Sequence, residues 1–270
     1  MSQKLSKKTT LTIYLIALAG QFAWAVENQY YNVFMYNEIA PVPIYVSLMV
    51  MITAVASTVT TIVMGAVSDV KGKRRPFMLF GFIFWTITTS IFPFAAFVTP
   101  VILAIITAIL FDTIMTYFGA TAYDAAFNSY VTDVTTLENR GKAVGIIEIM
   151  TLVATLFVYG AAGFIIEAFG YYFFFILIGV LVALIGISGA LLVKDSDTLT
   201  PLNMSIAAHI RSTFQIKTFK KVAFLNTIMK KEMRVLIAVL MLIVAVSLAA
   251  NLVVAQIQLI FFLVQHSVLI

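Results

Sequence analysis

The chain has 270 residues, of which 62% are hydrophobic and 11% are charged, and its mean hydropathy is +1.05. A composition this apolar excludes a soluble globular protein, and the absence of cysteine excludes disulfides, thiolate metal sites and cysteine nucleophiles. The net charge of +5 lies in clusters of Lys and Arg that flank apolar stretches, so we expect these clusters to meet membrane lipid and not nucleic acid.

Seven apolar stretches are long enough to cross a bilayer, whose hydrocarbon core is ~30 Å thick and needs roughly 20 helical residues. We expect helices, because lipid offers no partner to an unpaired backbone group and the alternation of barrel strands is absent. The first stretch is longer than a signal-peptide core, so we interpret it as a retained span. The predicted spans are Leu11–Tyr36, Ile44–Val67, Phe77–Val98, Val101–Tyr130, Val144–Ala168, Tyr171–Val193 and Val235–Val264.

The connections between these spans alternate in charge. Those around 41–43, 99–100 and 169–170 lack Lys and Arg, whereas those at 68–76 and 131–143 carry both. Because cationic loops stay in the cytoplasm, this alternation predicts an integral multi-pass protein of the plasma membrane with a cytoplasmic N-terminus.

A long basic segment separates six spans from the seventh. It carries eight Lys and Arg residues between 194 and 234. We therefore predict a six-helix transmembrane bundle over 1–193, a cytoplasmic linker over 194–234, and the first span of an incomplete C-terminal bundle over 235–270. Residues 209–231 fit a basic amphipathic helix on the membrane surface, and they fit a solvated linker equally well.

The connection between the second and third spans reads Gly65-Ala-Val-Ser-Asp69-Val-Lys-Gly72-Lys73-Arg74-Arg75-Pro76. It resembles the signature loop of the major facilitator superfamily, although Val70 stands where that family usually has Arg. The resemblance implies that Gly65 lets two helices approach closely and that Asp69 ends the second helix at the inner side. The basic residues would bind the inner surface and nearby acidic groups. The residues that the resemblance assigns to conformational switching are Gly65, Asp69, Gly72, Lys73, Arg74 and Arg75.

Two further stretches resemble the same family. Asp133-Val-Thr-Thr-Leu-Glu-Asn-Arg-Gly-Lys-Ala-Val-Gly145 is similar to its connection between spans four and five, and Gly160-Ala-Ala-Gly163 with Gly170 is similar to its fifth-span pattern. The resemblance implies an all-α membrane protein: a six-span N-terminal bundle of the major facilitator type plus one further span, truncated from twelve. Its partner would be the missing C-terminal half or a second copy. An inner charged network is expected from Asp133, Glu138, Arg140 and Glu148.

Carboxylates inside the spans are the candidates for chemistry. No Lys or Arg lies in any span, so Glu27 and Asp112 lack a cationic partner there. Such carboxyls usually face a wet cavity or take up a proton. At ~1.5 Å per residue, Asp112 lies near the midplane and Glu27 in the outer third of its span. Asp124 lies near the inner interface, where we expect salt bridges with Arg140 or with the basic residues at 71–75.

Polar residues near these carboxylates predict a central cavity. Gln21, Asn28 and Asn32 share one face of the first span, although each amide could instead form an interhelical hydrogen bond. The family resemblance implies that spans one, four and seven line the cavity while three and six face lipid. The expected residues of this substrate and coupling-ion cavity are Gln21, Trp24, Glu27, Asn28, Asn32, Asp112, Thr116, Tyr123 and Asn251.

The predicted function is secondary active transport of a small polar solute by alternating access, with no enzymatic activity, cofactor or metal. We expect symport with a proton or sodium ion. A loose likeness to glycoside–cation symporters, in the Ser-Asp…Arg-Arg-Pro run and the first span, favours a sugar. The alternatives are a receptor-like seven-span protein and an inactive fragment of a carrier. The cytoplasmic N-terminus disfavours a receptor, and a retinal protein would need the lysine that 235–270 lacks.

Overall fold

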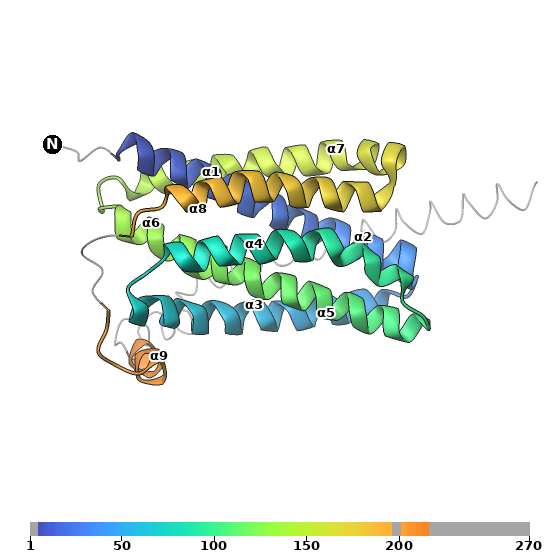
Figure 1. The fold of residues 1–270 in the computed structure, drawn as a ribbon, viewed down its shortest axis with the longest axis horizontal. Helices are drawn as coiled ribbons and strands as arrows, with labels where there is room; N and C mark the ends of the chain where they lie inside the picture. Colours follow the sequence, from blue (N-terminus) through green and yellow to red (C-terminus); the bar gives the residue numbers. More distant parts are fainter. Residues whose placement is uncertain (1–4, 196–200, 216–270) are drawn as a thin grey trace, which may run out of the picture. The chain divides into compact units, whose positions relative to one another are not determined.

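The computed structural model describes residues 5–195 and 201–215, and within these residues the chain is helical with no strand. Five apolar helical stretches of this part of the chain are long enough to cross a membrane. The last of them, Arg140–Leu192, is interrupted at Gly170, whose φ of 82° and ψ of 169° are non-helical. Figure 1 shows the chain reversing direction there. The stretch therefore forms two antiparallel rods, and the first six predicted spans are confirmed. The seventh, Val235–Val264, lies outside the described residues.

The rods lie side by side in the compact unit Met1–Ile210 (Figure 1). The first rod comprises α1 (Lys7–Val26), a π-helical turn (Glu27–Tyr31), α2 (Asn32–Phe34) and a second π-helical turn (Met35–Ile39). The second and third are α3 (Pro43–Lys71) and α4 (Arg75–Ile91), the latter ending in a 3-10 turn (Phe92–Phe97). The fourth comprises α5 (Val101–Gly119), a π-helical stretch (Ala120–Phe127) and α6 (Asn128–Val134). α7 (Arg140–Val182) holds the fifth rod and the start of the sixth, which continues through Ala183–Ile187 to α8 (Ser188–Leu192). A short helix, α9 (Ile206–Gln215), follows.

Close packing at small residues brings the first, third and fourth rods together. In lipid the hydrophobic effect does not drive helices together, so small residues that allow close contact favour their association. A Cβ added to Gly20 would overlap the ring of Tyr123. One added to Gly119 would lie 2.8 Å from Cε2 of Trp85 and 3.1 Å from Cη2 of Trp24. These two glycines therefore set how closely Tyr123 and Trp24 approach the neighbouring rods.

An aromatic cluster joins the first, third and sixth rods at the end of the bundle away from the 68–76 loop. The rings of Tyr31 and Phe92 are stacked, with centroids 3.7 Å apart and an interplanar angle of 12°. Phe175 meets both of these rings edge-on or tilted, and Phe34 meets Phe92 and Phe175 edge-on. By contrast, large apolar side chains such as Val55 and Leu156 are exposed on the outside of the bundle, as expected of a surface that faces lipid.

Candidate functional site

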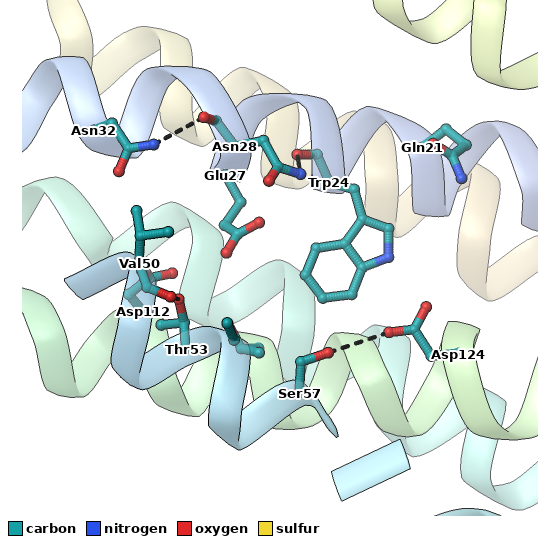
Figure 2. Close-up of a pocket in the computed structure, with 12 residues that line it drawn as sticks. Gln21, Trp24, Glu27, Asn28, Asn32, Val50, Thr53, Ser57, Asp112 and Asp124 are labelled. Atoms are coloured by element: carbon teal, nitrogen blue, oxygen red, sulfur yellow. Dashed lines mark hydrogen bonds between the residues drawn. The ribbon is translucent and has the colours of Figure 1, made fainter. Parts of the chain in front are cut away.

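A polar cavity of about 510 Å³ lies among the first, second and fourth rods (Figure 2). Three of its lining residues are carboxylates, and none is Lys or Arg. The lining residues are Gln21, Trp24, Glu27, Asn28, Asn32, Val50, Thr53, Ala54, Ser57, Asp112, Thr116 and Asp124. The structure thus brings together seven of the nine predicted cavity residues. Tyr123 lies just behind the wall, and Asn251 lies outside the described residues.

The first rod supplies the wall that carries the amides. Asn28 Nδ2 donates to the Trp24 carbonyl at 2.7 Å, and Asn32 Nδ2 donates to the Asn28 carbonyl at 2.8 Å. Both bonds lie within the rod, around the π-helical turn Glu27–Tyr31, and differ from the interhelical bonds weighed from the sequence. Each amide oxygen keeps its acceptor capacity beside the cavity, because an amide carries a separate donor and acceptor.

Gln21 links the cavity wall to Tyr123. Its Nε2 donates to the Tyr123 hydroxyl at 2.9 Å, and the Tyr123 ring packs where Gly20 has no side chain. Tyr123 is 5% exposed, so it holds a wall residue in place and does not itself line the cavity. The sequence analysis predicted that Tyr123 lines the cavity, whereas the structure places it behind Gln21.

The fourth rod supplies two carboxylates at different depths. Asp112 is 2% exposed, and its Oδ1 has no hydrogen-bond partner among the described residues. The same is true of the hydroxyl oxygen of Thr116, one helical turn along. Figure 2 shows the Glu27 side chain of the first rod extending across the cavity toward the wall formed by Thr53 and Asp112. The structure therefore contains buried polar atoms that a bound water, ion or solute would satisfy.

Asp124 differs from its predicted place. Instead of joining Arg140 or the 71–75 residues, it lines the cavity and accepts a long hydrogen bond of 3.5 Å from Ser57. Ser57 and Thr53 belong to the second rod, which sequence reasoning did not assign to the cavity. Their four-residue spacing is a helical signal, but Ser and Thr also bond their own helix, as Thr53 does to the Met49 carbonyl at 3.0 Å.

The signature loop forms a second polar centre, at one end of the bundle. Gly72, with φ of 61°, ends α3 in the left-handed conformation that favours glycine. The following Arg74 is buried, and it contacts Asp69 at 2.6 Å, Asp133 at 2.9 Å and the Ser68 hydroxyl at 2.5 Å. Burial lowers the pKa of Arg74, but its hydrogen bonds to Asp133 and Asp69 outweigh burial, so the net pKa is raised and the guanidinium stays charged.

Two chain segments after the sixth rod also meet this loop. One carboxylate oxygen of Asp195 accepts the backbone N–H groups of Arg74 (2.7 Å) and Arg75 (2.9 Å), which would otherwise be unpaired at the start of α4. His209 Nε2 lies 3.1 Å from the second oxygen of Asp69. The Asp69 carboxylate therefore joins the loop to the chain after the sixth rod as well as to Arg74.

Some expected members of the inner network lie elsewhere. Arg140 donates to the Thr135 hydroxyl and the Thr132 carbonyl, and within the described residues no ion pair joins it to Glu138 or Glu148, which are exposed. Asp133 is in the network, through Arg74. A Cβ added to Gly65 would meet no described atom within 4 Å, so the close approach implied by the family resemblance is not made in this part of the chain. Lys73 and Arg75 have exposed side chains.

The described residues form an apolar helical bundle around a carboxylate-lined cavity, with an ion-pair cluster at one end, and this arrangement fits a membrane transporter. The family model for the Major Facilitator Superfamily matches residues 7–268, and the chain belongs to that family. Searches of curated proteins and of solved structures gave no match. Among the described residues, no group of His, Asp and Glu could hold a metal ion.

Proposed function

We propose that this protein is a secondary active transporter that carries a small polar solute, in the first instance a sugar, together with a proton or sodium ion. The observation that supports this is the cavity itself. Three carboxylates, three side-chain amides and an indole ring surround a volume of about 510 Å³ inside an otherwise apolar bundle. Ionisable groups at such positions usually mark the path of a substrate or ion.

The chemistry of the wall suits a hydroxyl-rich solute. Trp24 offers a flat apolar ring, which is held from behind by Trp85 at a centroid distance of 5.0 Å. The amide oxygens of Asn28 and Asn32 remain free to accept hydrogen bonds, because only their nitrogens bond the helix. A pyranose ring has apolar faces and a rim of hydroxyl donors, so it would pair with both kinds of surface. An organic cation would use the indole and the carboxylates instead.

Asp112 is the group we assign to ion coupling. It is nearly inaccessible, and one of its oxygens has no partner among the residues that the structure describes. Burying a charge without a partner is costly. Binding a proton or a cation would remove that cost. Binding of the ion at Asp112 would then favour binding of the solute in the cavity, and this links the ion gradient to solute binding. We also propose a cytoplasmic N-terminus, because the signature loop and the basic connection at 131–143 lie on one side, where Arg74 contacts Asp133.

The test is solute accumulation in proteoliposomes as a function of external pH, with and without a sodium gradient. Asp112→Asn removes the charge with little change of shape, so it should abolish gradient-driven accumulation while solute exchange at equal concentrations persists. Glu167→Gln, which removes an exposed carboxylate of α7 that is not among the lining residues, is the matched control and should accumulate solute normally. Normal accumulation by Asp112→Asn, with unchanged pH and sodium dependence, would reject the coupling role of Asp112.

A further inference from the structure

A second hollow lies on the outer surface of the bundle, separate from the central cavity. It occupies about 450 Å³ between α3 and α4, with α5 behind it, at the end of the bundle that holds the signature loop. Lysines line one part of it and aromatic side chains the rest. The lining residues are Met64, Lys71, Lys73, Pro76, Phe77, Phe80, Gly81, Phe84, Tyr117, Phe118 and Thr121.

The aromatic part of this groove faces the bilayer. Phe80 is 61% exposed and Phe84 is 44% exposed, although both belong to an apolar span. Phe84 is held by stacking on Phe118, with centroids 4.9 Å apart and an interplanar angle of 21°. Gly81 permits α4 to approach the fourth rod here, since a Cβ on Gly81 would lie 2.6 Å from the Cβ of Ala122. The groove is therefore a defined apolar hollow. Because it lies on the outer surface of a membrane-spanning helix, a lipid acyl chain is the molecule that suits it.

The two lysines at the polar end have no carboxylate partner among the described residues. Arg74 takes Asp69 and Asp133, and Asp195 accepts backbone N–H groups, so the acidic side chains nearby are already engaged. The Lys71 ammonium lies 5.6 Å from the centroid of the Phe77 ring, which holds it beside the groove. Two such cations next to an apolar groove at the membrane interface complement a lipid with a negative headgroup.

We propose that this groove binds one anionic phospholipid, with its phosphate between Lys71 and Lys73 and one acyl chain along Phe77, Phe80 and Phe84. The phospholipid belongs to the leaflet on the side of the signature loop. This site is independent of solute transport and would hold even if the transported substrate is not a sugar. It makes the groove selective for charge, since a zwitterionic lipid would set its own cationic group against the two lysines.

Native mass spectrometry of the full chain in detergent tests the headgroup, with phosphatidylglycerol and phosphatidylcholine of equal chain length as probes. The parent should retain phosphatidylglycerol in preference to phosphatidylcholine. Each lysine contributes roughly fivefold near an anionic surface, so Lys71→Gln/Lys73→Gln should weaken phosphatidylglycerol binding at least about tenfold. Lys7→Gln/Lys142→Gln removes the same charge from exposed lysines elsewhere, and it should bind like the parent. Equal losses in the two double variants would refute a site at the groove.

A photoreactive phosphatidylglycerol with a diazirine on its acyl chain tests the apolar half in the parent itself, so the result does not depend on whether a variant folds. Cross-links should concentrate on Phe77, Phe80 and Phe84. An excess of unlabelled phosphatidylglycerol should suppress them, whereas glycerol phosphate, which has no acyl chain, should not. Cross-links spread evenly over all lipid-facing helices, or equally strong labelling by a phosphatidylcholine analogue, would overturn the proposal.

Discussion

Replacing Gly20 with alanine is the sharpest test of the packing that positions the cavity wall. A Cβ at this position would overlap the Tyr123 ring, which has no free space in the core, being only 5% exposed. The ring must move, and its hydroxyl then loses the 2.9 Å hydrogen bond from Gln21. The cost arises entirely from this one contact between the first and fourth rods.

The expected magnitude follows from three effects. Forcing an extra carbon into a packed core costs about 1–3 kcal/mol. Loss of a partly buried hydrogen bond costs about 1 kcal/mol. Alanine in place of glycine within a helix returns about 1 kcal/mol. The free energy of unfolding should therefore fall by about 2 kcal/mol, so the overlap outweighs the gain in helix propensity.

The assay is unfolding in mixed micelles by titration with SDS, followed by circular dichroism. Gly163→Ala is the matched control, because a Cβ on Gly163 meets no described atom within 4 Å and should leave stability unchanged or raise it by up to ~1 kcal/mol. In a Tyr123→Ala background, Gly20→Ala should no longer destabilise the protein. If Gly20→Ala and Gly163→Ala have equal stability, or if the loss persists without the Tyr123 ring, the reasoning fails.

Two further predictions concern the signature loop and the topology. Arg74→Ala should lower the free energy of unfolding by about 2–3 kcal/mol. This is at the low end for a broken buried ion pair, because the Asp69 side chain is 34% exposed. In the same SDS titration, the control Arg75→Ala should change the free energy of unfolding by less than about 0.5 kcal/mol. Cysteines placed at the exposed positions Pro41 and Leu137 should label from opposite sides, and only Pro41→Cys should react with an impermeant thiol reagent in intact cells. Labelling of Leu137→Cys alone would invert the proposed orientation.

The spans could be predicted from the sequence because each depends on a single local property. A run of apolar residues of sufficient length must be helical in lipid, whatever surrounds it. The turn at Gly170 was likewise predictable, since a glycine without flanking Lys or Arg separates two apolar runs. The signature loop could be recognised because its residues follow a fixed order, and the structure joins two of them, Arg74 and Asp69, in an ion pair.

The cavity was only partly predictable, because its wall depends on how each rod is rotated against its neighbours. Periodicity places Gln21, Asn28 and Asn32 on one face, and the structure turns that face inward. The four-residue spacing of Thr53 and Ser57 is a weaker signal, because a hydroxyl in a helix can also donate to a carbonyl of its own helix. Counting residues assigned Asp124 a depth near the interface, but depth alone does not tell whether a side chain faces the cavity or the loops.

The cavity and the signature loop are mechanically connected through the second and fourth rods. α3 carries Ser57 in the cavity wall and continues to Asp69, while the fourth rod carries Asp124 and continues to Asp133. Arg74 binds both of these terminal aspartates, so it clamps together the ends of the two rods that meet at the Ser57–Asp124 contact. Helices are stiff over the roughly 13–18 Å between these levels, at ~1.5 Å per residue. The two rods therefore cannot separate at the loop end without breaking the bonds that Arg74 makes to Asp69 or Asp133.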